Sequence, residues 1–128
     1  RLLRVLNREL PSSAVYFETN QATPSDQMLP FLRTIASDMM SSPGSMLRIE
    51  GHADARGTTE HNEELAKNRA EAVAEVMRSF GVPGERIMVL SFGERRPIQS
   101  GISQRALSRN RRVELILLKE TPSTWHER

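Results

Sequence analysis

Residues 49–73, IEGHADARGTTEHNEELAKNRAEAV, change from the periodicity of a strand to that of a helix. Apolar or small side chains alternate with polar ones over residues 46–54, which predicts a strand with one buried face. From about Asn62 apolar residues recur every three or four positions, which predicts a helix that ends at Gly81. Asn62 is expected to cap its first turn. The polar turn at 55–61 folds the chain back, so that strand and helix can lie side by side.

The rest of the chain continues this alternation of strands and helices. Further strands are expected at 14–19, 87–93 and 112–119, a helix beginning at Pro30, and a short helical turn within 103–110. The order β-α-β-α-β-β predicts an α+β sandwich, with one four-stranded mixed sheet and helices packed on one face. We expect three parts, namely a flanking segment at 1–13, the domain at 14–119 and a flexible C-terminal tail at 120–128.

The composition excludes several kinds of site. The chain has 128 residues, enough for one domain with a real core, and it has no Cys, which excludes disulfides and thiolate metal sites. Its 18 basic and 16 acidic residues give a net charge of only +2, which is not typical of a nucleic-acid-binding protein. No apolar run approaches the roughly 18 residues that cross a membrane. Because the chain starts at Arg1 rather than Met, we expect it to be part of a longer protein.

His52 and Asp54 are the first candidates for chemistry, since the alternation places both on one side of the strand. With His61 from the following turn, they could bind a transition metal and form a metal-assisted hydrolase. Their spacing matches no strong metal signature, however, and neither a nucleophile elbow nor a phosphate-binding loop accompanies them. We therefore expect no metal, no cofactor and no enzymatic activity, and we keep this hydrolase as the alternative.

Asp54 and Arg69 form the second candidate site. Asp54 ends the strand, and Arg69 lies about two turns into the helix that follows. Asp54 can accept an ammonium group and Arg69 a carboxylate, and an α-amino acid carries both charges about 3–4 Å apart. Equally, the two side chains could simply pair with each other, which contributes little at an exposed position. The spacing alone leaves both interpretations open.

Three blocks of sequence together resemble the OmpA-like C-terminal domain family, which is found in OmpA, Pal and MotB proteins. The blocks are GHADARGTTEHNEELAKNRAEAV (51–73), SFGERRP (91–97) and LSRNRRVEL (107–115), and the resemblance extends from about Val15 to Leu118. It implies a β-α-β-α-β-β fold, which agrees with the order of elements above. It also implies non-covalent binding of peptidoglycan through the meso-diaminopimelate of its stem peptide, without catalysis.

The resemblance also assigns ligand-binding roles to particular residues. Those that match the family's motifs are Asp54, Arg69, Asn62, Leu65, Phe17 and, at the opening of the last strand, Asn110, Arg111 and Arg112. Because neighbouring residues of a strand point to opposite sides, we expect Arg111 rather than Arg112 to face the ligand. His52 either lines the groove or braces the loop. At two positions the chain differs from many members, with Ala53 in place of Thr and Glu18 in place of Asp.

These residues imply a specificity and a location. Diaminopimelate keeps an ammonium and a carboxylate at one end of its side chain, whereas lysine lacks that carboxylate and would leave Arg69 unpaired, at a cost of ~1–3 kcal/mol. We expect the domain in the periplasm, as part of an outer- or inner-membrane-anchored protein, with peptidoglycan as its partner and any membrane contact made by a segment absent from this chain. A scaffold domain that acts through other envelope proteins or as a homodimer is the remaining alternative.

Overall fold

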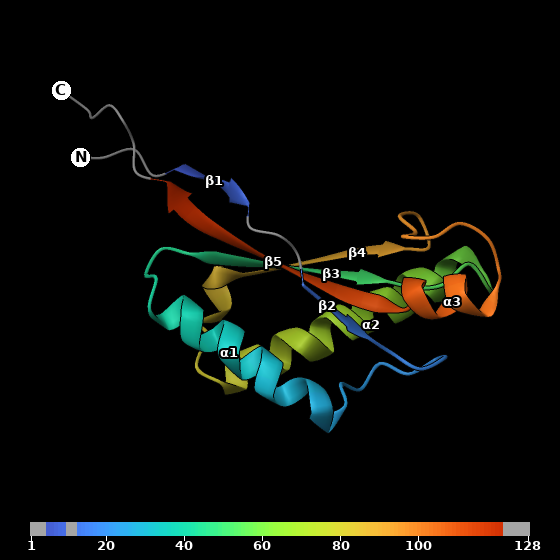
Figure 1. Cartoon of the computed structure of the whole chain (residues 1–128), viewed down its shortest axis with the longest axis horizontal. Helices are drawn as coiled ribbons and strands as arrows, with labels where there is room; N and C mark the ends of the chain where they lie inside the picture. Colours follow the sequence, from blue (N-terminus) through green and yellow to red (C-terminus); the bar gives the residue numbers. More distant parts are fainter. Residues whose placement is uncertain (1–4, 10–12, 122–128) are drawn as a thin grey trace.

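The structure, a computed structural model, describes residues 5–9 and 13–121. In these residues five strands form one sheet, namely β1 (Val5–Glu9), β2 (Ser13–Tyr16), β3 (Met46–His52), β4 (Ile87–Gly93) and β5 (Arg112–Thr121). The same residues contain the helices α1 (Leu29–Met40), α2 (Thr59–Ser79) and α3 (Gln104–Asn110), and the short 3-10 helices η1 (Asp26–Met28) and η2 (Gly84–Arg86). None of the described helices combines the length and the apolar character needed to span a bilayer. Figure 1 shows α1 and α2 together on one side of the sheet and α3 at one end of the molecule.

β5 organises the sheet. It pairs antiparallel with β3, and β3 pairs parallel with β4, so the sheet is mixed. β1 and β2 both pair antiparallel with β5, β2 along its first half and β1 along its second half. The two short strands thus share one edge position and the sheet is four strands wide, which confirms the predicted four-stranded mixed sheet of an α+β fold.

β1 is the main difference from the predicted architecture. Its residues lie within the segment that we expected to flank the domain, yet they join the sheet. The reason is that β5 has ten residues and β2 pairs with only Arg112–Leu115, so that the rest of this edge accepts a second strand. The strand predicted at 14–19 is shorter, at Ser13–Tyr16, and residues 122–128 of the predicted tail lie outside the described residues.

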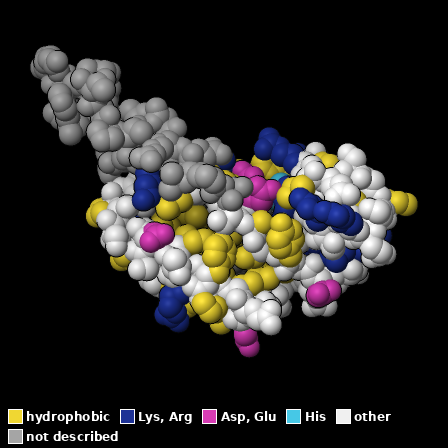
Figure 2. All heavy atoms as spheres, viewed as in Figure 1, with side chains coloured by type: hydrophobic (Ala, Val, Ile, Leu, Met, Phe, Trp, Pro, Cys, Tyr) yellow, Lys and Arg dark blue, Asp and Glu magenta, His cyan; other side chains and the backbone are white. Residues whose placement is uncertain are grey.

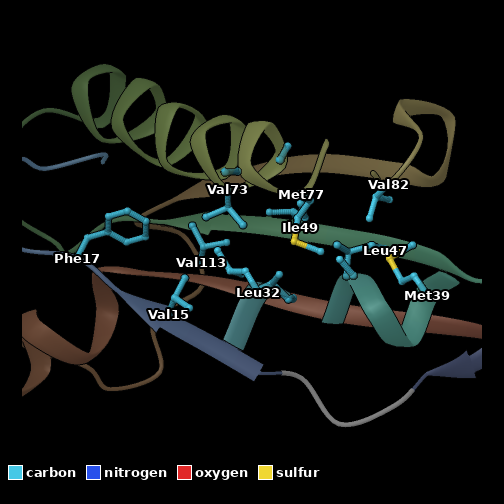
Figure 3. Packing of buried hydrophobic residues seen from close by; sticks show 14 residues of the cluster. Val15, Phe17, Leu32, Met39, Leu47, Ile49, Val73, Met77, Val82 and Val113 are labelled. Carbon is cyan, nitrogen blue, oxygen red and sulfur yellow. The ribbon is translucent and has the colours of Figure 1, made fainter. Parts of the chain in front are cut away.

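The hydrophobic core lies between the sheet and the helices α1 and α2 (Figure 3). α1 contributes Leu32 to it, and α2 contributes Val73 and Met77; all three side chains are fully buried. Leu47 and Ile49 of β3 meet them from the sheet, because alternate residues of a strand point to the same side. The packing of the two long helices on one face agrees with the prediction.

Gly51 brings β3 and α2 closer together than any other residue would allow. A Cβ atom at this position would lie 1.9 Å from the backbone oxygen of Ala66 in α2. The helix therefore crosses the end of β3 at backbone contact distance. Arg69 lies one turn after Ala66 and Asp54 two residues after the end of β3, so this close approach brings the two candidate side chains into one region.

α2 begins earlier than we expected and ends as predicted. Its N-cap is Thr58, whose backbone is extended (φ −80°, ψ 155°) and whose hydroxyl accepts a hydrogen bond from the His61 N–H at 3.1 Å. The prediction of Asn62 as the cap is wrong, because Asn62 is already helical and its N–H bonds to the Thr58 carbonyl at 3.0 Å. At the other end Gly81 has a φ of +99° and donates to the Arg78 carbonyl, which closes the helix.

The polar face of β3, which carries Glu50 and His52, is buried, whereas the alternation predicted that it would be exposed. Glu50 is 8% exposed and His52 only 1%. β4 has one extra residue, Phe92, opposite the step from Gly51 to His52, and its ring stacks on the imidazole with 5.4 Å between centroids. The expectation of a single buried face is therefore wrong at this end of the strand, because the bulge places an aromatic ring over the polar side.

Candidate functional site

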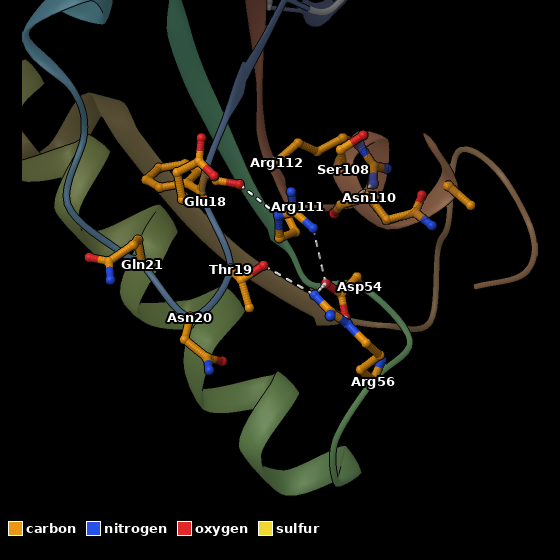
Figure 4. A network of polar contacts seen from close by, with 12 residues as sticks. Glu18, Thr19, Asn20, Gln21, Asp54, Arg56, Ser108, Asn110, Arg111 and Arg112 are labelled. Carbon is orange, nitrogen blue, oxygen red and sulfur yellow. Dashed lines mark hydrogen bonds and ion pairs between the residues drawn. The ribbon is translucent and has the colours of Figure 1, made fainter. Parts of the chain in front are cut away.

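A cavity of about 260 Å³ lies where β3 ends and α2 begins. Three segments contribute to it: the loop after β2, the turn after β3 and the first turns of α2. The lining residues are Thr19, Asn20, Asp54, Arg56, Gly57, His61, Asn62, Leu65 and Arg69. Figure 4 shows Thr19 of the first loop next to Arg56, whose Nη2 donates to the Thr19 hydroxyl at 3.2 Å. Four of the predicted site residues are thus brought together, namely Asp54, Asn62, Leu65 and Arg69.

Arg69 is fully buried and is held by the backbone. Its Nε donates to the Gln21 carbonyl at 2.8 Å, Nη1 to His52 at 3.0 Å and Nη2 to Glu18 at 3.1 Å. The guanidinium carbon lies 5.3 Å from the centre of the Phe17 ring. A guanidinium has five N–H donors, so two of them have no partner among the described residues. These contacts fix the position of the guanidinium but leave two of its five N–H donors without a hydrogen bond to the described part of the chain.

The charge of Arg69 is only partly compensated. Burial lowers its pKa to about 10, opposed by the Asp54 carboxylate and reinforced by the Arg111 charge, so that it stays protonated at neutral pH. Within the described part of the chain Asp54 and Arg69 form no ion pair, and the simple pairing that the spacing allowed is not made. A buried cation without a bonded carboxylate is costly. Its two remaining N–H groups suit a carboxylate from outside the chain.

Asp54 is paired with two other arginines. Arg56 donates to its Oδ2 from Nη2 at 2.9 Å and to its Oδ1 from both Nε and the backbone N–H, at 3.3 and 2.9 Å. Arg111 Nη1 lies 3.5 Å from Oδ2. Burial by itself would raise the pKa of Asp54, but the hydrogen bonds and charge of Arg56, together with Arg111, hold it below its usual value. Asp54 is therefore ionised at neutral pH, and Arg56, with 45% of its side chain exposed, is a cation that can leave it.

Asn62 and Leu65 form the helical wall of the cavity. The Asn62 side chain is 2% exposed and donates from Nδ2 to Glu94 Oε1 at 2.8 Å. Its Oδ1 lies 3.5 Å from the point where a Cβ of Gly57 would stand, on the side of the cavity. Leu65, one turn further along α2, is half-buried. The helix thus offers the cavity an amide oxygen and an apolar surface.

Phe17 and Arg111 do not line the cavity but support residues that do. Phe17 lies beneath the Arg69 guanidinium, and its carbonyl accepts from Arg111 Nε at 2.8 Å. Arg111 thereby links the Phe17 backbone to Asp54. Arg112 turns to the other face of the sheet, where its Nε lies 2.6 Å from Glu114 Oε2. The two neighbouring arginines face opposite sides, and Arg111 is the one on the side of the cavity (Figure 4).

His52 also lies outside the lining of the cavity. Its ring is stacked on Phe92, and only its carbonyl, bonded to Arg69, touches the site. Neither ring nitrogen has a hydrogen-bond partner in the described structure. Burial, with the charge of Arg112 as the next cause, lowers the pKa of His52 to about 4. The imidazole is therefore neutral at pH 7 and braces the strand end instead of facing the cavity.

The alternative metal site finds no support in this arrangement. His61 lies in the cavity wall with Nε2 3.4 Å from Asn20 Oδ1, whereas the His52 ring faces away. Across residues 5–9 and 13–121 no three His, Asp or Glu side chains are grouped so that they could hold a metal ion. The described residues therefore do not assemble the hydrolase centre of His52, Asp54 and His61.

Four lining residues were not among the candidates from the sequence: Thr19, Asn20, Arg56 and Gly57. His61 was a candidate only for the alternative metal site. Arg56 carries a signal that could have been used, since a basic residue two positions after an acidic one in a turn can fold back onto it. Asn20 carries a weaker one: it has a φ of +57°, a conformation that Asn adopts more readily than most residues. The remaining contacts depend on how the loop after β2 meets α2, which local sequence does not specify.

The chain matches the model of the OmpA family over residues 16–111. It is 36% identical to the peptidoglycan-associated lipoprotein of Legionella pneumophila, in an alignment that covers 84% of this chain and 62% of that protein. With the peptidoglycan-associated lipoprotein of Pseudomonas aeruginosa it is 35% identical, over 78% of this chain and 59% of the relative. The chain thus spans about 60% of the length of these relatives.

Solved structures show the same fold. The peptidoglycan-associated lipoprotein of Burkholderia pseudomallei superposes with a TM-score of 0.79 at 32% identity, over 81% of this chain and 88% of that one. The C-terminal domain of Helicobacter pylori MotB gives a TM-score of 0.73 at 25% identity, over 88% and 86%. These matches agree with the prediction of a binding domain rather than an enzyme. Taken with the family match across most of its length, they show that the chain belongs to the OmpA family.

Proposed function

We propose that this domain binds peptidoglycan non-covalently, through the meso-diaminopimelate of the stem peptide, and so anchors a larger envelope protein to the cell wall of a Gram-negative bacterium. Two of its relatives are named for an association with peptidoglycan. The proposed location is the periplasm, as part of an outer- or inner-membrane-anchored protein.

One observation carries the proposal: a buried guanidinium and a carboxylate line one cavity without pairing with each other. Arg69 keeps two N–H donors beyond its three backbone bonds, and Asp54 is ionised. A ligand that brings one carboxylate and one ammonium a few ångströms apart complements both charges. The free end of the diaminopimelate side chain has this chemistry.

In the proposed complex the ligand carboxylate accepts from the two remaining N–H groups of Arg69. The ligand ammonium replaces the guanidinium of Arg56 on Asp54. Because Arg69 is fully buried, the exchange requires Arg56 to swing outward, or the loop after β2 to shift. Leu65 provides the wall against which the methylene chain of the ligand packs. On binding, the ligand ammonium thus takes the place of the Arg56 guanidinium on Asp54, and the ligand carboxylate supplies an anion for Arg69.

Arg69 then determines the specificity. A stem peptide with lysine at this position has the ammonium but not the carboxylate, so the two N–H groups of Arg69 lose water without gaining a partner. An unsatisfied buried donor costs roughly 1–3 kcal/mol, and more for a charged group. We expect discrimination against lysine of at least about tenfold.

Cosedimentation with purified sacculi tests the proposal. Asp54→Asn keeps the shape of the side chain without its charge, and Arg69→Lys keeps the charge without the planar fork. Each is expected to weaken binding roughly 100-fold, as for the loss of a buried charge-assisted contact. The matched control is Arg78→Lys, an exposed position on the same helix, which should bind as the wild type does. Normal binding by both site variants, with the fold verified by circular dichroism, would refute the proposal.

A further inference from the structure

Net positive charge is concentrated in the segment 94–112. This segment contains six Arg and one Glu, a net charge of +5, whereas the whole chain has only +2, so the remainder is net negative. Figure 2 shows Lys and Arg side chains gathered over the end of the molecule at which Figure 1 places α3 and the loop that leads to it. A charge separated in this way favours an anionic partner.

Half of these arginines remain available to such a partner. Three are compensated by carboxylates, in the pairs Arg95–Glu63, Arg111–Asp54 and Arg112–Glu114. Arg96, Arg105 and Arg109 are exposed and form no ion pair within the described residues. Arg96 lies 3.9 Å from the centre of the Phe92 ring, which holds it at the surface. Arg105 and Arg109 are one turn apart in α3 and therefore share a face.

Two exposed isoleucines lie between Arg96 and Arg105 in the sequence. Ile98 is 43% exposed and Ile102 is 73% exposed, in the loop between β4 and α3. Asn110, itself buried, fixes this loop: its Oδ1 accepts from the N–H groups of Ile98 and Gln99, and its Nδ2 donates to the Gln99 carbonyl. Ser103 caps α3 at the other end of the loop. The isoleucines are therefore held outward by a defined backbone.

We infer that the loop 94–103 and the exposed face of α3 form a docking surface for a membrane that contains anionic lipids. Arg96, Arg105 and Arg109 would contact the headgroups, while Ile98 and Ile102 enter the boundary between headgroups and acyl chains. A bilayer accommodates separate apolar side chains anywhere along its surface, whereas a protein partner needs a matching pocket for each. The two isolated isoleucines among uncompensated arginines therefore favour a lipid surface over an acidic protein.

This surface is separate from the proposed peptidoglycan site. None of its five residues lines the cavity at Asp54 and Arg69. The inference therefore goes beyond peptidoglycan binding and does not depend on it, so that a domain bound to the cell wall could still rest on a nearby membrane.

Vesicle cosedimentation tests the inference without peptidoglycan. The 128-residue chain is mixed with vesicles of phosphatidylcholine alone, or with about 30% phosphatidylglycerol added, at low salt. Binding is expected only to the anionic vesicles. Arg105→Gln with Arg109→Gln should weaken it about 25-fold, since each basic residue at the surface contributes a factor of about five. The matched control, Lys67→Gln with Arg78→Gln, removes the same charge from α2 and should change binding by no more than about twofold.

The isoleucines decide whether the partner is a membrane or only an anion. Ile98→Ser with Ile102→Ser is expected to weaken vesicle binding by roughly tenfold while leaving its salt dependence unchanged. Equal binding to both kinds of vesicle, no binding to either, or equal losses in the α3 variant and its control would overturn the inference. Unchanged binding by the isoleucine variant would also overturn it, because the surface would then be a site for soluble acidic partners.

Discussion

Two buried arginines lie on opposite sides of the end of β3, and their surroundings differ. Arg112 is 3% exposed, with Glu114 at 2.6 Å and a further bond to the Arg96 carbonyl at 3.0 Å. Arg69 is fully buried as well, but its hydrogen-bond partners among the described residues are three backbone carbonyls. His52 interacts with both: its carbonyl accepts a hydrogen bond from Arg69, and the charge of Arg112 helps to lower the pKa of its ring.

The comparison separates a structural cation from one that is available for binding. A buried ion pair such as Arg112–Glu114 balances its two charges within the chain, and removing one of the two residues destabilises the fold. Arg69 has only neutral acceptors, two remaining donors and a cavity beside it. We infer that burial of an arginine indicates binding only where no carboxylate of the chain compensates it.

The largest expected effect is on the stability of the protein and comes from Arg112 and Glu114, on the face of the sheet opposite the cavity. Arg112→Met leaves Glu114 without this partner in a largely buried position and should lower the free energy of unfolding by roughly 3 kcal/mol. Replacing both residues, as Arg112→Met with Glu114→Leu, should recover most of the loss. Urea denaturation measures both. At temperatures where the variants are folded, sacculus binding should equal that of the wild type, and a specific loss of binding by Arg112→Met would break the contrast.

The second prediction concerns pH and the residue between the two arginines. The pKa of His52 is lowered from 6.5 to about 4, so below pH 6.5 the unfolded chain binds the proton more readily than the folded one. The contribution of His52 to stability is complete above pH 6.5 and is lost as the pH falls toward 4, by at most about 3 kcal/mol. Denaturation at a series of pH values measures it. His52→Phe should flatten the profile between pH 6.5 and 4; an unchanged profile would show that other groups cause it.

The third prediction concerns Arg69 and the proposed binding cavity. Arg69→Lys retains a cation but cannot make three backbone bonds and a forked contact at once. We expect a loss of roughly 2.7 kcal/mol in the free energy of binding to sacculi, a factor of about 100. Arg112→Lys is the matched substitution on the other face and should leave the affinity unchanged. Equal losses in the two variants would mean that the faces are not functionally distinct.

The smallest expected effect comes from the start of the helix that carries Arg69. Thr58→Ala removes the capping bond to the His61 N–H and should cost about 1 kcal/mol of stability. Thr59→Ala, the neighbouring residue inside the helix, should cost much less. Thermal denaturation compares them. A larger loss of stability in Thr59→Ala than in Thr58→Ala would mean that Thr58 is not the N-cap of α2.

Local chemistry made parts of this fold predictable from the sequence. β4 has the predicted bounds, Ile87–Gly93, because a short apolar run is flanked by turn residues on both sides. Gly81 ends α2 because its positive φ disfavours other residues. Asp54 and Arg69 could be assigned to one region because a strand that leads directly into a helix places its end beside the first turns of that helix.

The remaining differences arise from contacts between distant segments. Thr58 and Asn62 are both good capping residues, and only the backbone conformation at Thr58 selects between them. The orientation of His52 depends on an extra residue in β4, forty positions later in the chain. Arg56 reaches Asp54 because the turn after β3 folds its backbone N–H and its side chain back onto the carboxylate. Each outcome needs two segments to be placed together, which periodicity does not describe.

The most direct test of the account is a calorimetric titration of the chain with two stem tripeptides that differ only in their last residue, meso-diaminopimelate or lysine. If Arg69 is the cation that remains available for a ligand, the diaminopimelate peptide binds and the lysine peptide binds at least about tenfold more weakly. In Arg69→Lys the two affinities should become similar. Equal affinity of the wild-type chain for both peptides, or no binding of the diaminopimelate peptide, would contradict the central claim.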